Sequence, residues 1–136
     1  MGSKKIRPTL VHTIICDDVR QELGGKFSLM GLFETISSQN FPVIHPRFAV
    51  MNEWTGGRGD FSCRMRLLAP DRATVLWESE SRFTLYNENQ RHRDISVRFS
   101  TTFPVPGTYW LEMLLDGAQI ALVPLTVQQL SQQIVH

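Results

Sequence analysis

The feature that most constrains the fold is an Asp116-Gly117 pair placed between two runs of β-forming residues in the last third of the chain. The first run follows a Pro/Gly break and alternates along the strand, and the second begins directly after the glycine. A two-residue turn with positive φ at both central positions favours Asp-Gly or Asn-Gly. The segment 103–127 therefore predicts a β-hairpin.

A turn of that length also sets the register of the hairpin, because side chains alternate between the two faces of a strand. The expected partners on one face are Leu115 with Ala118, Met113 with Ile120, Leu111 with Leu122 and Tyr109 with Pro124. Trp110 is expected opposite Val123 on the other face, in an apolar stripe that needs a second layer or a partner. Pro124 cannot donate to a ladder of hydrogen bonds and should mark a bulge, a bend or an edge.

A second hairpin is predicted from 61–69 and 75–86, with 71–73 in its loop. The expected pairs are Phe61 with Phe83, Met65 with Ser79 and Leu67 with Trp77 on the core side, and Arg66 with Glu78 and Arg64 with Glu80 on the other. Opposite charges across two strands are a common way to finish a solvated sheet face. The arginines are thus expected to be mostly neutralised, which argues against a nucleic-acid partner.

The rest of the chain adds strand signals separated by short turns. Strands are predicted at 9–16, 26–36, 47–54 and 92–103, and the run at 26–36 is apolar on both parities, which indicates a central or doubly covered strand. The polar stretch 17–25 has room for a single helical turn. About eight strands without a convincing amphipathic helix predict an all-β fold, a two-sheet antiparallel sandwich of the immunoglobulin-like kind.

A single domain accounts for the chain of 136 residues, since no linker, repeat or low-complexity block divides it. We expect a flexible N-terminal segment at 1–8, a single β-sandwich domain at 9–127 and a polar C-terminal tail at 128–136. The formal net charge of +1 supplies no field that would recruit nucleic acid or an anionic membrane. The longest apolar runs are too short to cross a bilayer. We therefore expect neither nucleic acid nor membrane as a partner.

The two cysteines, Cys16 and Cys63, each lie among alternating apolar residues. Two buried thiols acting as small hydrophobic side chains are the favoured interpretation, and a disulfide between the sheets is the alternative. The basic start of the chain lacks the apolar region and cleavage site of a secretory signal. A cytoplasmic protein fits these features best.

The glycine-rich loop Trp-Thr-Gly-Gly-Arg-Gly-Asp at 54–60 is the best local candidate for a functional surface. Its glycines let a ligand approach the backbone closely. The candidate binding surface consists of Trp54, Arg58, Asp60 and Trp110. The loop is not a P-loop, because the Gly-Lys-Ser/Thr ending and the following helix are both missing. The alternative is a mobile strand connection in which Trp54 packs at the end of the sandwich.

No set of residues has the spacing of a catalytic or metal site. The available metal donors are His12, Cys16, His45, Cys63, His92 and the Asp17-Asp18 pair, and none has the local spacing of a zinc or calcium site. A Gly-x-Ser-x-Gly elbow is missing as well. The run Arg91-His92-Arg93 is either a solvated charged turn, with Asp94 and Glu88 near enough to compensate, or an anion site, and the turn is favoured. We expect no catalytic residue, no bound metal and no cofactor.

Three stretches of the chain carry a family resemblance. They are Ile15-Cys-Asp-Asp-Val-Arg-Gln-Glu-Leu-Gly-Gly-Lys-Phe-Ser-Leu-Met-Gly-Leu-Phe-Glu34, Phe41-Pro-x-x-His-Pro-Arg-Phe48, and Pro106-Gly-Thr-Tyr109 with the Asp116-Gly117 ending. Together they resemble a family of small uncharacterised bacterial proteins with a domain of unknown function, over most of the chain from Arg7 to Val127. The resemblance implies a single-domain bacterial protein and supplies no active-site residue.

Three functions are weighed for such a chain. The favoured one is a non-enzymatic β-sandwich module that binds an unidentified protein partner or itself, with a homo-oligomer as one form of that association. The alternative is a small-ligand or carbohydrate-binding domain that uses the loop at 54–60. An enzyme whose active site is assembled from residues scattered along the sequence is the least favoured.

Overall fold

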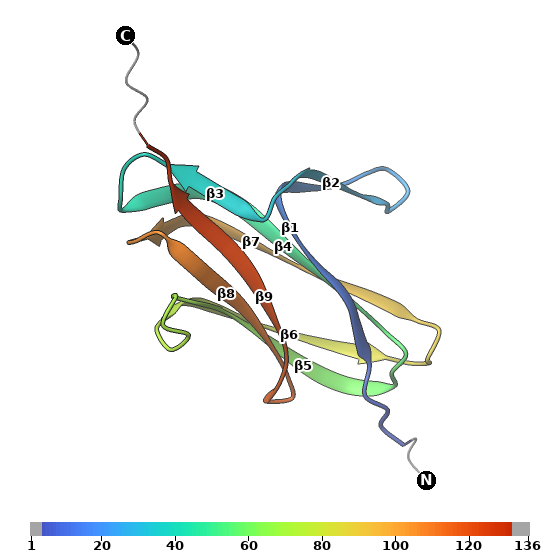
Figure 1. Ribbon diagram of the computed structural model, residues 1–136. Helices are drawn as coiled ribbons and strands as arrows, with labels where there is room; N and C mark the ends of the chain where they lie inside the picture. Colours follow the sequence, from blue (N-terminus) through green and yellow to red (C-terminus); the bar gives the residue numbers. More distant parts are fainter. Residues whose placement is uncertain (1–3, 132–136) are drawn as a thin grey trace.

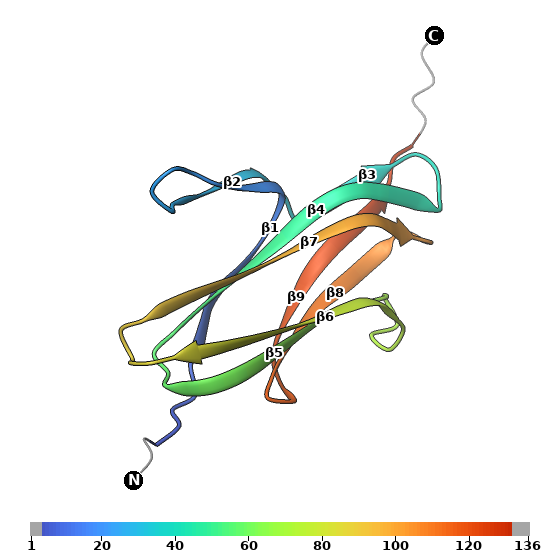
Figure 2. The same ribbon diagram turned by 180° about the vertical axis from the view of Figure 1, so that it is seen from behind.

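Two sheets built from nine β-strands pack face to face in the computed structural model, which describes residues 4–131 (Figures 1 and 2). The strands are β1 (Thr9–Gln21), β2 (Phe27–Leu32), β3 (Thr35–Ser38), β4 (Val43–Thr55), β5 (Gly59–Leu68), β6 (Val75–Leu85), β7 (Arg91–Phe103), β8 (Gly107–Leu115) and β9 (Ala118–Gln129). Residues 4–131 form no helix, and hence none that could cross a membrane. The predicted all-β, two-sheet class is confirmed. Residues 1–3 and 132–136, which belong to the predicted N-terminal segment and C-terminal tail, lie outside the described part.

The strand order is β2-β1-β4-β7 in the four-stranded sheet and β3-β9-β8-β5-β6 in the five-stranded sheet. Every pairing in the first sheet is antiparallel, whereas β3 runs parallel to β9 in the second. The prediction of a wholly antiparallel sandwich is wrong at this pair. Parallel neighbours need a long connection, and here the chain passes through β4 to β8 before it returns. The immunoglobulin-like subtype stays a prediction.

The hairpin of β5 and β6 has the predicted register. Phe61 lies opposite Phe83, and the other expected pairs also form, with one shift in register close to the loop. Asp71 holds the loop closed, because its carboxylate accepts the backbone N–H groups of Ala73 and Thr74, both at 2.8 Å. Local alternation and turn chemistry were sufficient to predict this element.

The last hairpin keeps the predicted turn but not the predicted register. Asp116 and Gly117 have φ values of 47° and 84°, as a turn with positive φ at both central positions requires. Ile120 is then an extra residue on β9. Beyond it, Met113 faces Ala121, Leu111 faces Val123, Trp110 faces Pro124 and Tyr109 faces Leu125. The predicted pairs beyond the turn are wrong because this β-bulge reverses the faces of β9.

The N-terminal hairpin differs most from its prediction. The stretch 17–25, where a helical turn was expected, forms no helix: β1 continues to Gln21. The chain then reverses through Gly24 and Gly25, both at positive φ. β1 pairs with β4 as far as Cys16 and with β2 from Cys16 onward. The β1–β2 hairpin therefore stands out from the sheet (Figures 1 and 2). The expected central strand at 26–36 is in fact two short strands, β2 and β3, each at the edge of a different sheet.

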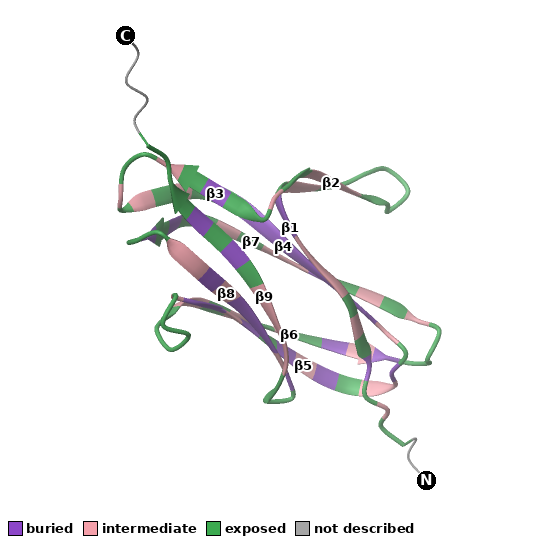
Figure 3. Ribbon diagram, in the orientation of Figure 1, coloured by how far each residue is buried: buried purple, intermediate pink, exposed green. Residues whose placement is uncertain are grey.

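The core lies between the two sheets and is filled by inward side chains of the long strands. Its largest fully buried apolar members are Trp54, Tyr109, Phe48, Phe103, Leu67, Leu85, Leu111, Met113, Leu115 and Leu125. Figure 3 shows buried and exposed residues alternating along β9, as expected for a strand with one face on a core. Complete burial of such a side chain contributes about 1.5–3 kcal/mol. The core thus fixes which face of each strand points outward.

Candidate functional site

The two outward faces of the sandwich differ in chemistry. The five-stranded sheet presents a lattice of charges, in which Glu80 lies 3.7 Å from Arg64 and 3.5 Å from Arg82. Arg66 lies opposite Glu78 in register, as expected, but its guanidinium donates to Glu112 on β8 at 2.7 Å. This is the solvated face that the sequence predicts. The outward face of the four-stranded sheet is mainly apolar.

Four rows of side chains cross that apolar face, because paired residues of neighbouring strands lie side by side. The rows are His12, Glu53 and Arg93; Ile14, Met51 and Ile95; Cys16, Ala49 and Val97; and Arg47 with Phe99. The first three rows take one residue each from β1, β4 and β7. The face is therefore charged at one end and apolar through the middle.

A groove of about 440 Å³ lies over the charged end and the first apolar row. It is lined by His12, Ile14, Met51 and Glu53, by Lys26, Phe27 and Leu29 of the β1–β2 hairpin, and by Arg91 and Arg93 of β7. The groove exists because the hairpin leaves the plane of the sheet and forms a wall beside it. Its size falls within the range of small binding sites, roughly 300–1,000 Å³.

Glu53 lies at the centre of the charged end, and its side chain is only 1% exposed. Arg91 Nη2 donates to Oε2 at 2.6 Å. Arg93 Nε forms an ion pair with Oε1 at 2.8 Å, and His12 Nε2 lies 3.8 Å from Oε2. Burial alone would raise the pKa of Glu53. The hydrogen bond from Arg91 and the charges of both arginines outweigh burial and hold the pKa below its ordinary value of 4.5. The carboxylate is therefore ionised at neutral pH and fixes two guanidinium groups at the groove.

Exposed apolar side chains continue the surface beyond the groove. Val97 is 38% exposed and Phe99 is 68% exposed. Leu32, which is 60% exposed, lies opposite Cys16 and so extends the row of Val97 onto β2. Single exposed apolar residues are ordinary, whereas several together mark an interaction surface. We call this set, the groove together with Leu32, Val97 and Phe99, the groove face.

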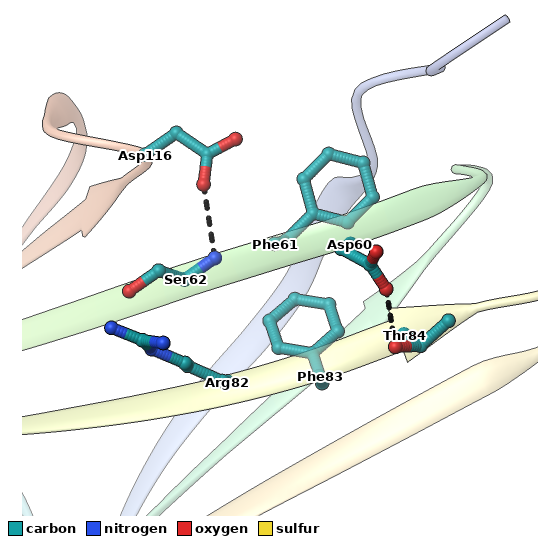
Figure 4. A pocket seen from close by; sticks show the side chains of 7 residues that line it. All are labelled: Asp60, Phe61, Ser62, Arg82, Phe83, Thr84 and Asp116. Carbon is teal, nitrogen blue, oxygen red and sulfur yellow. Dashed lines mark hydrogen bonds between the residues drawn. The ribbon is translucent and has the colours of Figure 1, made fainter.

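A second hollow, of about 480 Å³, lies on β5 and β6 beside the last turn (Figure 4). It is lined by Asp60, Phe61, Ser62, Arg82, Phe83, Thr84 and Asp116. Asp60 accepts the hydroxyl of Thr84 at 2.6 Å, and Asp116 accepts the backbone N–H of Ser62 at 2.9 Å, as Figure 4 shows. Asp116 also lies 2.8 Å from Lys5 Nζ. The acidic groups here hold strands and a turn together, so the groove face is the better-equipped site.

Residues 12–128 match a family of unknown function (DUF6941). The chain belongs to this family. The DUF6941 match begins at His12 in the groove and ends on β9, so it includes both sheets. The resemblance to a family whose domain has no known function is thereby confirmed, while bacterial origin stays a prediction. No curated protein matches the chain.

Three of the four sequence-predicted surface residues in this DUF6941 protein lie near the same end of the sandwich. Trp54 has no exposed surface, and its ring centroid lies 5.6 Å from that of Phe83 in the core. It is therefore not available to a ligand. Arg58 lies 3.4 Å from Glu88 of the β6–β7 loop. Asp60 lines the hollow on β5 and β6.

Trp110, the fourth predicted residue, is not brought to the others. It lies on the outward face of the five-stranded sheet, where Arg72 Cζ is 4.2 Å from its ring centroid. Its neighbour on β5 is Leu68, eight positions along the strand from Asp60, which corresponds to about 26 Å. The expected apolar stripe with Val123 is absent because the bulge in β9 places Pro124 beside Trp110. The four residues do not form one surface.

A buried polar cluster joins β4 and β7 on the core side. Asp94 accepts Trp54 Nε1 at 3.2 Å and Asn52 Nδ2 at 3.4 Å. Burial raises the pKa of Asp94, and these two hydrogen bonds oppose it in part. Burial lowers the pKa of His92, with the charge of Asp94 opposing it. The two hydrogen bonds satisfy Trp54 Nε1 and Asn52 Nδ2 inside the sandwich, whereas His92 Nε2 is buried without a hydrogen-bond partner among residues 4–131.

Both thiols are free and buried, as the sequence predicts. Burial raises the pKa of Cys63 to about 12 and also raises that of Cys16. The thiolate, not the thiol, is the nucleophile and the metal ligand, so neither cysteine is prepared for chemistry. Within residues 4–131, no group of three or more His, Cys, Asp or Glu side chains is placed to hold a metal ion.

Sequence reasoning missed Glu53. The charged run of β7 was expected to be compensated by Asp94 and Glu88, but Asp94 lies in the core and Glu88 pairs with Arg58. A usable signal exists in β4. Glu53 lies on the same face of β4 as Ala49 and Met51, so it is a single charge on an otherwise apolar face of this strand. Such a charge needs a cation from a neighbouring strand.

Proposed function

We propose that this protein is a non-enzymatic interaction module that docks an extended segment of a partner protein across the groove face. The observation that carries the proposal is the contrast between the two outward faces. Charged pairs finish the five-stranded sheet, whereas the apolar rows of the four-stranded sheet end on β7 in exposed side chains, Val97 and Phe99. Arg47 Cζ lies 5.7 Å from the ring centroid of Phe99 and leaves most of that side chain exposed. Burial of such rows is the usual driving force for association.

The length of the face supports a polypeptide partner over a small ligand. From Arg93 to Phe99 along β7 the outward residues span about 20 Å. A drug-sized molecule would fill the groove and leave Val97 and Phe99 in water. An extended segment of about seven residues would follow all four rows.

The chemistry of the remaining polar groups supports a binding role rather than catalysis. Asp94 is committed to Trp54 and Asn52, and the thiols are protonated at neutral pH. A ligand site built on the loop at 54–60 lacks its aromatic platform, because Trp54 is buried. We also propose a cytoplasmic location, since two free thiols fit a reducing compartment.

The proposal is tested by affinity capture from lysate of the source organism with two matched variants. Val97→Ser/Phe99→Ser removes apolar contact from the groove face. Val75→Ser/Val105→Ser removes exposed apolar residues elsewhere and is the control. We expect the wild type and the control to retain the same partner and the groove-face variant to lose it. Retention of every captured protein by all three forms would contradict the proposal.

The segment that docks on the groove face can also belong to a second copy of this protein. Sedimentation equilibrium of the three proteins separates it from binding to another protein. A homo-oligomer that dissociates in Val97→Ser/Phe99→Ser, but not in the control, would make a second copy the partner.

A further inference from the structure

We infer that the segment received by the groove face carries a carboxylate, and that Arg91 and Arg93 bind it. The inference rests on the proposed function and specifies its partner. The two guanidinium groups lie at the charged end of the groove, where Glu53 holds both of them. The chemistry recognised is that of an Asp or Glu side chain in an extended segment.

Most hydrogen-bond donors of the two arginines have no partner within residues 4–131 and can bind a ligand. A guanidinium has five N–H donors. Arg91 donates through Nη2 to Glu53, and Arg93 forms an ion pair with the same carboxylate through Nε. Their side chains are 59% and 43% exposed. Each arginine is thus anchored by one end and presents the rest of its planar group to the groove, which suits bidentate binding of a carboxylate.

The charge of the groove favours an anion. Among its lining residues, Arg91, Arg93 and Lys26 are cationic and Glu53 is the one carboxylate. Arg91, Arg93 and Glu53 together carry two positive charges and one negative charge, which leaves a net charge of +1. This matches one carboxylate better than the nearly doubly charged phosphate of a modified residue.

The rows of the sheet also determine which side chains of the bound segment are in contact with the groove face. In an extended segment, every second side chain points the same way, at intervals of about 6.6–6.8 Å. Outward rows of the sheet follow the same interval. A carboxylate over Arg93 therefore places the next two side chains of that face over the row of Met51 and over Val97. The expected motif is acidic, any, apolar, any, apolar.

Fluorescence anisotropy with short labelled peptides tests this inference. The probes are the peptide Gly-Glu-Thr-Leu-Thr-Leu-Thr-Gly and two versions with glutamine or phosphoserine in place of glutamate. The wild type should bind the glutamate peptide about tenfold more tightly than the glutamine peptide. Arg91→Gln/Arg93→Gln should abolish this difference. Arg64→Gln/Arg82→Gln removes the same charge from the five-stranded sheet and should preserve it.

Arg91→Gln/Arg93→Gln leaves the buried Glu53 charge unpaired and can therefore unfold the protein. A third substitution controls for this effect. Adding Glu53→Gln removes that charge, and the triple variant should bind both peptides equally. Tighter binding of the phosphoserine peptide than of the glutamate peptide would overturn the choice of carboxylate. Equal loss of the preference in Arg64→Gln/Arg82→Gln would show a net-charge effect and overturn the site.

Two outcomes separate this inference from the proposed function. Equal binding of the glutamate and glutamine peptides, lost in Val97→Ser/Phe99→Ser, would overturn the carboxylate while the docking surface stands. Failure of the wild type to bind any of the peptides would also overturn the inference. The capture experiment with the apolar variants decides the proposed function independently of both results.

Discussion

Trp54 donates its indole N–H to Asp94 at 3.2 Å, and the two residues lie on neighbouring strands inside the sandwich. The bond explains how a large aromatic side chain beside a glycine-rich loop is held in the core. Trp54 is fully buried, and Asp94 gains partners from both Trp54 and Asn52. The residue that offered a ligand platform in the sequence is therefore part of the structure's interior.

Trp54→Ala should be strongly destabilising. Removal of a buried tryptophan loses transfer free energy and leaves a cavity, at a cost of about 3–5 kcal/mol. Urea denaturation measures the free energy of unfolding. Trp110→Ala is the matched control and should cost much less, because Trp110 lies on an outward face beneath Arg72. A similar loss in both variants would contradict the assignment of Trp54 to the core.

Asp94→Asn should change how stability depends on pH. The raised pKa of Asp94 means that the folded state binds this proton more tightly than the unfolded chain does. The corresponding stabilisation is complete below the ordinary value of 3.8 and is lost as pH rises through the folded-state pKa. Asparagine cannot titrate and can still accept from Trp54. The free energy of unfolding of the wild type should therefore fall relative to the variant across that window, and a constant difference would contradict it.

Glu53→Gln should destabilise the protein by about 1–3 kcal/mol, because the charge-assisted hydrogen bond from Arg91 and the ion pair with Arg93 are weakened at a buried site. The lowered pKa of Glu53 means that its contribution is present above 4.5 and is lost as pH falls through the folded-state pKa. Denaturation at neutral pH and at acidic pH measures both effects. Glu80→Gln, on the exposed charge lattice, is the control and should have a much smaller effect.

The two thiols should react slowly in the native protein. Burial and raised pKa keep Cys16 and Cys63 protonated and shielded. A thiol-specific chromogenic reagent should detect two thiols after denaturation without reductant and little reaction before it. Fast labelling of Cys63 in the folded state would contradict its placement in the core.

Local patterns predicted those parts of the fold that depend on local interactions. The β5–β6 register follows from alternation and the Asp71 loop, and the last turn follows from Asp116-Gly117. The bulge at Ile120 has no such signature, because it is selected by which side chains the core accepts further along β9. The parallel pair of β3 and β9 was also beyond reach, since β4 to β8 separate the two strands in the sequence and no local pattern links them.

The candidate site was less predictable than the fold. Arg91 and Arg93 were visible as an alternative anion site, but their partner Glu53 lies about 40 positions away on a strand whose pairing with β7 is long-range. The groove wall depends on the β1–β2 hairpin leaving the sheet after Cys16. Alternation along a single strand predicts neither the pairing of Glu53 with the arginines of β7 nor the departure of the β1–β2 hairpin from the sheet.

The most direct test of the docking surface is a map of backbone amide chemical shifts in isotopically labelled protein during titration with the glutamate peptide. The largest changes should lie on β4, β7 and the β1–β2 hairpin, and they should disappear in Val97→Ser/Phe99→Ser. Changes centred on the loop at 54–60 or on β5 and β6, with β4 and β7 unmoved, would contradict the assignment of the groove face as the binding surface.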